Sequence, residues 1–379
     1  MTKVLLYSVF LIIGLIGSQF MSHAHEKWIE LGTMICLSFI MIHVGYEFEI
    51  DKNNPRQYLW DYVVAGTAAA FPWIFCAAYF IWAIGMDSWK EALLVARFSS
   101  PTSAGILFSM LAAAGLSITW VFRKARVLAI FDDLDTILLM IPLKVMMVGM
   151  KWQLIVIGLL IVIQLWLAWK YLHKWSLPTS WPWVILYSCL ITAFSEVVYI
   201  LSMRIDDVVP VLLEVLLPAF VLGCMLARPK GTNPHADDAL EGHQDGPETK
   251  QEQLVATIVA ALFMILVGLS TPKLQFDEVV WTLLIIHVVL ITILSNLGKM
   301  FPLFCYRSES TLRERFALSV AMFPRGEVGA GVLAVSMGYG LKGIAITVAI
   351  MSLTLNLLLT GIFILIVKRL IEKQPIAIR

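Results

Sequence analysis

Residues 127–142 read VLAIFDDLDTILLMIP and place three carboxylates inside a run that is otherwise apolar enough to cross a membrane. A charged side chain near the middle of a bilayer costs about 2.5–3.5 kcal/mol on insertion scales. Asp132 and Asp133 are adjacent and Asp135 is close by, so these residues must do something that apolar side chains could not do. We expect the adjacent pair to hold a cation and a proton in turn.

The composition is that of a polytopic membrane protein. Of the 379 residues, 59% are hydrophobic and only 15% are charged, whereas soluble domains carry about 25% charged residues. The formal net charge of +1 gives no reason to expect a nucleic-acid partner, and the lipid bilayer is the expected surrounding. The five cysteines form no CxxC motif and no cluster with histidine. We therefore expect buried thiols and no bound cofactor.

Helical membrane spans need about 20 mostly apolar residues. The sequence offers about twelve such segments, at residues 4–20, 29–50, 60–85, 91–116, 118–149, 152–171, 182–202, 208–227, 254–271, 277–299, 314–338 and 342–367. The first segment could pass for a signal peptide, but it lacks a clear small-residue cleavage pattern and is predicted to be a span. Basic residues between the spans show a roughly threefold excess on one side, which predicts cytoplasmic termini. The polar segment 228–253 is predicted to be a flexible cytoplasmic loop.

Two of the predicted spans are interrupted. Residues 96–105 read ARFSSPTSAG, and residues 323–331 read FPRGEVGAG. Proline removes a backbone donor and disfavours helix at the preceding residue, and glycine weakens a helix interior. Paired interruptions in two halves of a chain point to a transporter site built from inverted repeats. The alternative is that proline and glycine are simply common in membrane helices, but a charge in each break and the nearby carboxylates argue against it.

Taken together, these motifs resemble the cation:proton antiporter superfamily, and within it the NhaA/NapA-type sodium/proton antiporters. Besides the first break, the resemblance rests on residues 44–51 (VGYEFEID), 129–137 (AIFDDLDTI), 263–269 (FMILVGL), 297–299 (LGK) and 324–328 (PRGEV). It implies an all-α fold of about twelve transmembrane helices with two crossed broken helices. It also implies a core transport domain (60–149 and 277–370) and a panel domain for homodimerisation (1–50 and 151–271), in a bacterial inner membrane.

The resemblance also assigns roles at the site. Asp133 is expected to carry Na⁺ (or Li⁺) and H⁺ in turn, and Asp132 is expected to pair with Lys299 and to contribute to the Na⁺ site. A hard cation prefers oxygen ligands. The sequence departs from many relatives here, since it has Ser99-Ser100-Pro101 where they have Thr-Asp-Pro. Hydroxyls of Ser99, Ser100 and Thr102 and nearby carbonyls are therefore the further expected ligands. Asp135 stands where relatives often have glycine.

Three charged residues are expected to compensate charge at this site, namely Lys299, Arg325 and Glu327. Arg325 and Glu327 are expected to form an internal ion pair, with Glu47 or Glu49 as further partners. A buried lysine loses its proton readily, so Lys299 could release one when Na⁺ engages Asp132. That would give an electrogenic exchange of two protons per sodium ion. The alternative for Lys299 is that its ammonium reaches the membrane surface.

The function implied is Na⁺(Li⁺)/H⁺ antiport by alternating access, in which the core slides against the panel, and not an enzymatic activity. A K⁺/H⁺ antiporter or an ion-coupled symporter of related fold is the alternative. A more remote alternative is an intramembrane Mg²⁺-dependent prenyltransferase, with residues 206–207 as its second Asp-rich motif. The predicted topology opposes this, because residues 206–207 fall in a loop whereas the first motif lies inside a span.

Overall fold

The computed structural model describes residues 2–20, 26–47, 55–148, 152–204, 215–227, 250–271, 281–338, 341 and 343–372. Every extended regular element within these ranges is a helix, and the only β-type pairing among them is an isolated bridge between Trp175 and Leu226. The predicted all-α class is confirmed. The predicted helical segments all contain helix, but the number of membrane crossings is not fixed by these helices alone.

The chain divides into two compact units. The first comprises Met1–Glu30, Asp51–Gly149 and Met264–Arg379, and the second comprises Leu31–Ile50 and Met150–Phe263. Residues 1–30 thus group with the first unit, although they are predicted above to belong to the panel. The assignment of transport and dimerisation to these units remains a prediction.

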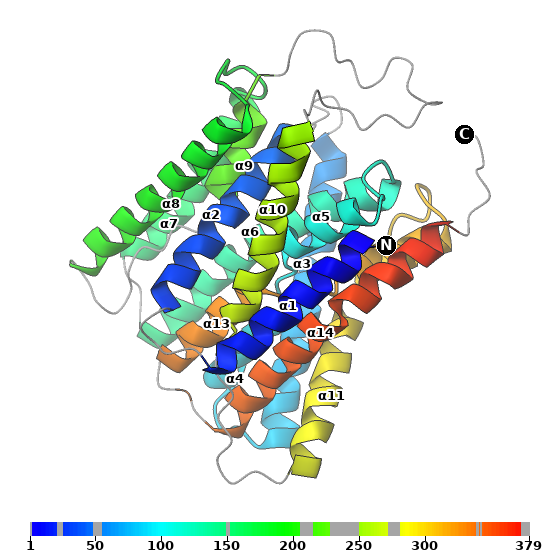
Figure 1. Cartoon of the computed structure of the whole chain (residues 1–379). Coiled ribbons are helices and arrows are strands. Elements are labelled where there is room, and N and C mark those ends of the chain that lie inside the picture. The colour runs from blue at the N-terminus through cyan, green and yellow to red at the C-terminus, as the bar shows by residue number, and fades with distance from the viewer. Residues whose placement is uncertain are drawn as a thin grey trace. The chain divides into compact units, whose positions relative to one another are not determined.

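The first unit contains the helices that carry the interrupted segments and the helices that pack around them. They are α1 (Thr2–Phe20), α3 (Pro55–Tyr79) with its π-helical extension η2 (Phe80–Ile84), α4 (Trp89–Ala96), η3 (Arg97–Ser99), α5 (Ala104–Ala113), α6 (Trp120–Val148), α11 (Trp281–Gly298), η4 (Phe301–Phe304), α12 (Leu312–Ala321), α13 (Glu327–Gly338) and α14 (Ile344–Glu372). α3 packs on both α6 and α11, and α14 packs on α11 and α12. Figure 1 shows α1 lying along α14, and the two helices are in contact.

The second unit is built from most of α2 (Glu26–Glu47), α7 (Trp152–Lys170), α8 (Trp181–Met203), α9 (Leu216–Met225) and the larger part of α10 (Lys250–Leu269). α9 packs on α7, and Gly45 of α2 lies directly against the Phe220 carbonyl and Gly223 of α9. Small residues at such crossings let helix backbones approach closely, as is typical of membrane helices.

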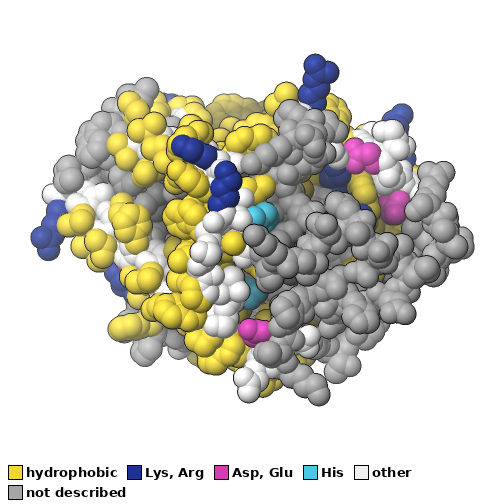
Figure 2. Space-filling model, turned by 90° about the horizontal axis from the view of Figure 1, so that it is seen from above, with side chains coloured by type: hydrophobic (Ala, Val, Ile, Leu, Met, Phe, Trp, Pro, Cys, Tyr) yellow, Lys and Arg dark blue, Asp and Glu magenta, His cyan; other side chains and the backbone are white. Residues whose placement is uncertain are grey.

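Apolar side chains cover much of the outer surface. In the view of Figure 2, hydrophobic side chains occupy most of the described surface and charged ones are sparse. Six helices in the described ranges are long and apolar enough to cross a membrane: Lys27–Tyr46, Arg56–Ile84, Trp181–Met203, Gln251–Leu269, Trp281–Phe304 and Ile344–Glu372. An apolar exterior of this extent suits a lipid surrounding, and the chain is a multi-pass membrane protein.

Candidate functional site

The two helix breaks lie against each other in the first unit. The Ser103 amide donates to the Pro324 carbonyl at 2.9 Å, and the Thr102 hydroxyl donates to the Met322 carbonyl at 2.9 Å. Irregular backbone at membrane depth is tolerated where its polar groups find partners within the protein. Each break therefore supplies partners for the backbone groups that the other break frees.

The local sequence explains where each half-helix stops and restarts. α4 ends in the short 3₁₀ turn η3, and Pro101 prevents the helix from continuing. α5 begins after Ser103, whose hydroxyl accepts a hydrogen bond from the Ile106 amide as an N-cap. In the second break, an alanine-sized Cβ at Gly326 would lie 3.0 Å from the Ser103 hydroxyl oxygen, so glycine permits the close crossing.

Arg325 joins the second break to the first. Its guanidinium is fully buried and donates to the Ser99 carbonyl at 2.8 Å and to the Asn296 side-chain oxygen at 2.7 Å. Two further donations go to the Phe323 and Ser295 carbonyls, at 2.9 and 2.8 Å. Arg325 thus donates to one backbone carbonyl in each break, those of Ser99 and Phe323, and to a carbonyl in the last turn of α11.

The ion pairs predicted for the second break fall outside what the structure describes. The side chains of Glu327 and Glu47 lie outside the described residues, and so does Glu49. The carbonyl and amide acceptors of Arg325 were not foreseen, because the sequence offers no signal for which backbone group a buried guanidinium will meet.

Asp132 and Lys299 form a buried ion pair. The Lys299 ammonium lies 2.7 Å from Asp132 Oδ2, and both side chains have no exposed surface. The same carboxylate oxygen accepts a hydrogen bond from the Thr102 amide at 2.7 Å, in the first break. The pairing predicted from the sequence is present, and the alternative of a lysine reaching the membrane surface is wrong for this arrangement. Asp132 thereby links α6, the turn that follows α11, and the first break.

Asp133 follows Asp132 on α6 and is also buried, with 1% of its surface exposed. Adjacent helical residues point about 100° apart, so Asp133 is directed away from the face on which Asp132 meets Lys299. Both carboxylates are buried within the first unit. Their separate roles in ion and proton binding remain predictions.

Asp135 lies one turn beyond Asp132 and is 4% exposed. Its main-chain carbonyl accepts a hydrogen bond from the Arg97 guanidinium at 3.1 Å, and Arg97 also lies over the Trp73 ring at 4.9 Å. A Cβ added to Gly66 of α3 would lie 2.9 Å from Asp135 Oδ2. Glycine at position 66 therefore makes the room that a third carboxylate needs in this helix interface.

The predicted hydroxyl ligands Ser99, Ser100 and Thr102 are all fully buried in or beside the first break. Ser99 donates its hydroxyl proton to the Ala96 carbonyl at 2.7 Å, and Ser100 donates to the Ala69 carbonyl at 2.8 Å. Ser100 also accepts from Arg97 at 2.7 Å. Each hydroxyl proton thus serves a carbonyl, and what these groups could offer a cation is an oxygen lone pair.

A second buried charge cluster was missed by sequence reasoning. The Lys124 ammonium lies 3.1 Å from Asp61 Oδ1 and 3.1 Å from Glu309 Oε2, and the Tyr306 hydroxyl donates to Asp61 Oδ1 at 2.7 Å. Burial and the Asp61 carboxylate raise the pKa of Tyr306, so its hydroxyl stays protonated as the donor. The available signal was a carboxylate at position 61 inside a predicted span, which needs a cationic partner.

Comparison with known proteins identifies the relatives of this arrangement. Forty-two chains of solved structures are similar to this chain. One is the structure of the sodium proton antiporter MjNhaP1 from Methanocaldococcus jannaschii at pH 8, with 16% sequence identity and a TM-score of 0.60. The match covers 97% of this chain and 92% of that chain. At this identity the likeness shows the fold. A search of curated proteins found no matching sequence.

Family membership follows from the sequence itself. The sequence model described as "Sodium/hydrogen exchanger, transmembrane" matches residues 3–369, nearly the whole chain. This result confirms the resemblance to cation:proton antiporters and identifies a transporter rather than an enzyme. The chain belongs to the sodium/hydrogen exchanger family, whose members exchange Na⁺ for H⁺ across a membrane.

Proposed function

We propose that this antiporter works by alternating access, with Asp133 as the group that carries Na⁺ (or Li⁺) in one direction and H⁺ in the other. The observation that carries the proposal is the buried Asp132–Lys299 pair at 2.7 Å, next to which Asp133 is a second buried carboxylate on the same helix. A carboxylate that binds either a proton or a cation, but not both, couples the two flows when only occupied states cross the membrane.

The ligands that we propose for Na⁺ are all oxygens, as a hard cation prefers. Asp133 supplies the charge, and Asp132 supplies a second carboxylate. The hydroxyl oxygens of Ser99, Ser100 and Thr102 and the carbonyls of the first break supply the remainder. Because the first break lacks the carboxylate found in many relatives, lone pairs of neutral oxygens replace it.

We propose that Lys299 decides the stoichiometry. When Na⁺ engages Asp132, the ammonium loses its ion-pair partner, and a desolvated lysine releases its proton readily. Two protons would then exchange for one sodium ion, and the cycle would move net charge. Arg325 is proposed to keep its charge throughout, because a guanidinium is not deprotonated in proteins.

We further propose that both termini face the cytoplasm, that the protein resides in a bacterial inner membrane, and that it works as a homodimer. The support for the first point is the bias of basic residues between spans. The support for a dimer is the family resemblance together with the apolar outer face of α8, where Phe194 is 64% exposed and Leu190 is 58% exposed.

The test of the carrier role is cation-driven proton movement in everted vesicles, followed by dequenching of a pH-sensitive dye. Asp133→Asn is expected to abolish the response to Na⁺ and Li⁺, whereas the exposed Asp87→Asn serves as the matched control and keeps it. Addition of Na⁺, Li⁺ and K⁺ from mildly acid to mildly alkaline pH distinguishes sodium exchange from potassium exchange. Full exchange by folded Asp133→Asn would contradict the assignment.

The test of stoichiometry uses Lys299→Arg, which preserves a cation beside Asp132 but cannot release a proton. In proteoliposomes the wild type is expected to respond to an imposed membrane potential. The variant is expected to exchange Na⁺ for H⁺ without that response. If the arginine variant remains as sensitive to the potential as the wild type, Lys299 does not supply the second proton.

A further inference from the structure

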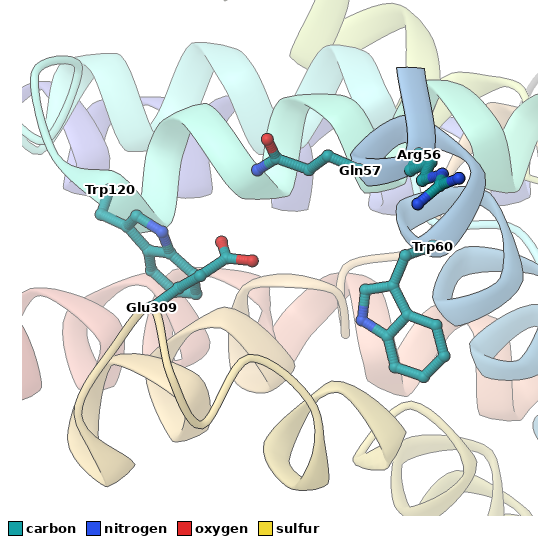
Figure 3. A pocket seen from close by; sticks show the side chains of 5 residues that line it. All are labelled: Arg56, Gln57, Trp60, Trp120 and Glu309. Atoms are coloured by element: carbon teal, nitrogen blue, oxygen red, sulfur yellow. The ribbon is translucent and has the colours of Figure 1, made fainter. Parts of the chain in front are cut away.

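A pocket outside the ion site has a lining that none of the transport chemistry uses. It is an open hollow on the surface, of about 700 Å³, and is lined by Arg56, Gln57 and Trp60 of α3, Trp120 of α6, and Glu309 of the loop that precedes α12. Figure 3 shows the Glu309 carboxylate beside Trp120 on one side, and Arg56 with Trp60 on the other. The Gln57 amide extends into the space between them.

The two sides of this pocket carry opposite charge. Glu309 shares the Lys124 ammonium with Asp61, since both carboxylates lie 3.1 Å from it. One ammonium between two carboxylates leaves one negative charge unmatched within this three-residue cluster. The Arg56 guanidinium supplies a positive charge on the opposite side. A ligand that carries both an ammonium and an anionic group would match both sides at once.

The aromatic walls fit the cationic part of such a ligand. Trp60 and Trp120 present indole rings from different helices, and an ammonium over an indole face is attracted by the ring quadrupole. Trp120 stands beside Glu309 in Figure 3, so one ammonium can meet a carboxylate and an aromatic face together. Arginine and an amide on the other side are suited to phosphate oxygens.

The position of the pocket along the helix indicates where the ligand comes from. Arg56, Gln57 and Trp60 occupy the first turns of the candidate span Arg56–Ile84, where tryptophan typically meets the headgroup region. The same face of α3 continues with Leu59 and Val63, which are 66% and 46% exposed. Acyl chains attached to a ligand in the pocket would find apolar surface next to it.

From this geometry we propose that the pocket binds the zwitterionic headgroup of an aminophospholipid. The ammonium lies between Glu309 and Trp120, and the phosphate lies against Arg56 and Gln57. An anionic phospholipid without an amine matches Arg56 but leaves the Glu309 side unmatched. Soluble phosphoethanolamine shares the headgroup chemistry but lacks acyl chains for the neighbouring apolar face.

The test measures lipid retention by the purified full-length protein in detergent micelles. Phosphatidylethanolamine and phosphatidylglycerol are added in equal amounts, and lipid adducts are counted by native mass spectrometry. The wild type is expected to retain phosphatidylethanolamine preferentially. Glu309→Gln removes the carboxylate and is expected to weaken that retention about two- to fivefold, as for a partly exposed ion pair. Trp120→Ala removes the indole that lies beside Glu309 and is expected to weaken retention by a similar factor.

Matched variants separate this pocket from general surface effects. Glu372 is 59% exposed and pairs with Lys368 at 3.4 Å, so Glu372→Gln removes a comparable ion pair elsewhere. Trp82 lies at the far end of the span Arg56–Ile84 and is 77% exposed, so Trp82→Ala removes an indole away from the pocket. Both control variants are expected to retain phosphatidylethanolamine as the wild type does. Equal retention of the two lipids, or equal losses in the controls, overturns the proposal. Tight binding of soluble phosphoethanolamine without lipid preference also overturns it, because the ligand is then not a lipid.

Discussion

Replacing Lys299 with methionine removes the ammonium that faces Asp132 while keeping a side chain of similar length. Both partners of this pair are fully buried, and 2.7 Å separates the ammonium nitrogen from the carboxylate oxygen. After the substitution Asp132 keeps the Thr102 amide as a donor, but no cation of the pair remains. The perturbation therefore tests the energy of an isolated buried carboxylate.

The expected magnitude follows from the burial. Removing one partner of a buried ion pair typically destabilises a protein by about 3–5 kcal/mol, whereas replacing both partners is often nearly neutral. Asp132→Asn keeps an oxygen that can accept from the Thr102 amide, so the double variant leaves neither an unpaired charge nor an unsatisfied amide. We expect it to lose about 1–2 kcal/mol, which is less than either single variant loses. The two substitutions are then coupled by about 4 kcal/mol or more.

The assay is denaturant unfolding of the four proteins in mixed micelles, followed by tryptophan fluorescence. Lys299→Met and Asp132→Asn are each expected to lower the unfolding midpoint, and the double variant is expected to recover most of the loss. Additive losses, in which the double variant is as unstable as the sum of the two singles, would refute the reasoning. The pair would then be two independent charges that happen to lie close together.

Three further substitutions probe the packing and the second charge cluster. Gly298→Ala places a methyl group against the backbone of Pro72, and we expect a loss of about 1–3 kcal/mol in unfolding free energy; an unchanged midpoint would contradict the close crossing. Gly66→Ala is expected to destabilise the wild type but to be tolerated when Asp135→Gly is also present, because the methyl would lie 2.9 Å from Asp135 Oδ2. For Tyr306 the pKa is raised in the folded protein, so its contribution is present below the unfolded value of about 10 and is lost as pH rises above it. Tyr306→Phe should therefore flatten the loss of stability that is measured as pH rises above about 10, relative to the wild type.

The sequence predicted those residues of the site that are unfavourable in an ordinary apolar membrane span. Charged residues and prolines inside apolar segments can be recognised from the sequence, because each leaves a charge or a backbone group that needs a partner within the membrane. Asp132, Asp133 and the two breaks were found in this way. The partner Lys299 came from the family resemblance, since nothing in its local sequence distinguishes a buried lysine from one that reaches the surface.

The remainder of the site depends on how helices cross, which local sequence does not specify. The Arg97 guanidinium meets the Asp135 carbonyl 38 residues away, and the Arg325 guanidinium meets the Ser99 carbonyl 226 residues away. A backbone carbonyl has no side-chain signature, so no pattern indicates which one an arginine will find. The Asp61–Lys124 pair was missed for a different reason. Lys124 lies near the start of the predicted span 118–149, where a basic residue is read as a topology signal and not as the partner of a buried carboxylate.

The charges buried around the crossing of the two breaks balance, among the side chains that the structure describes there. Three cations are almost fully buried and three carboxylates accompany them: Arg97, Lys299 and Arg325, with Asp132, Asp133 and Asp135.

Binding one Na⁺, or protonating Asp133, gives this set the same net charge of about +1 if Lys299 keeps its proton. The two loaded states then cross the membrane with equal charge and the exchange is electroneutral. If Lys299 releases its proton when Na⁺ binds, the sodium-loaded state is neutral while the proton-loaded state is not, so the membrane potential acts on the difference. On this charge count, the proposed electrogenicity depends on whether one ammonium group releases its proton, and the arginine variant at that position tests the proposal while keeping the remaining charges.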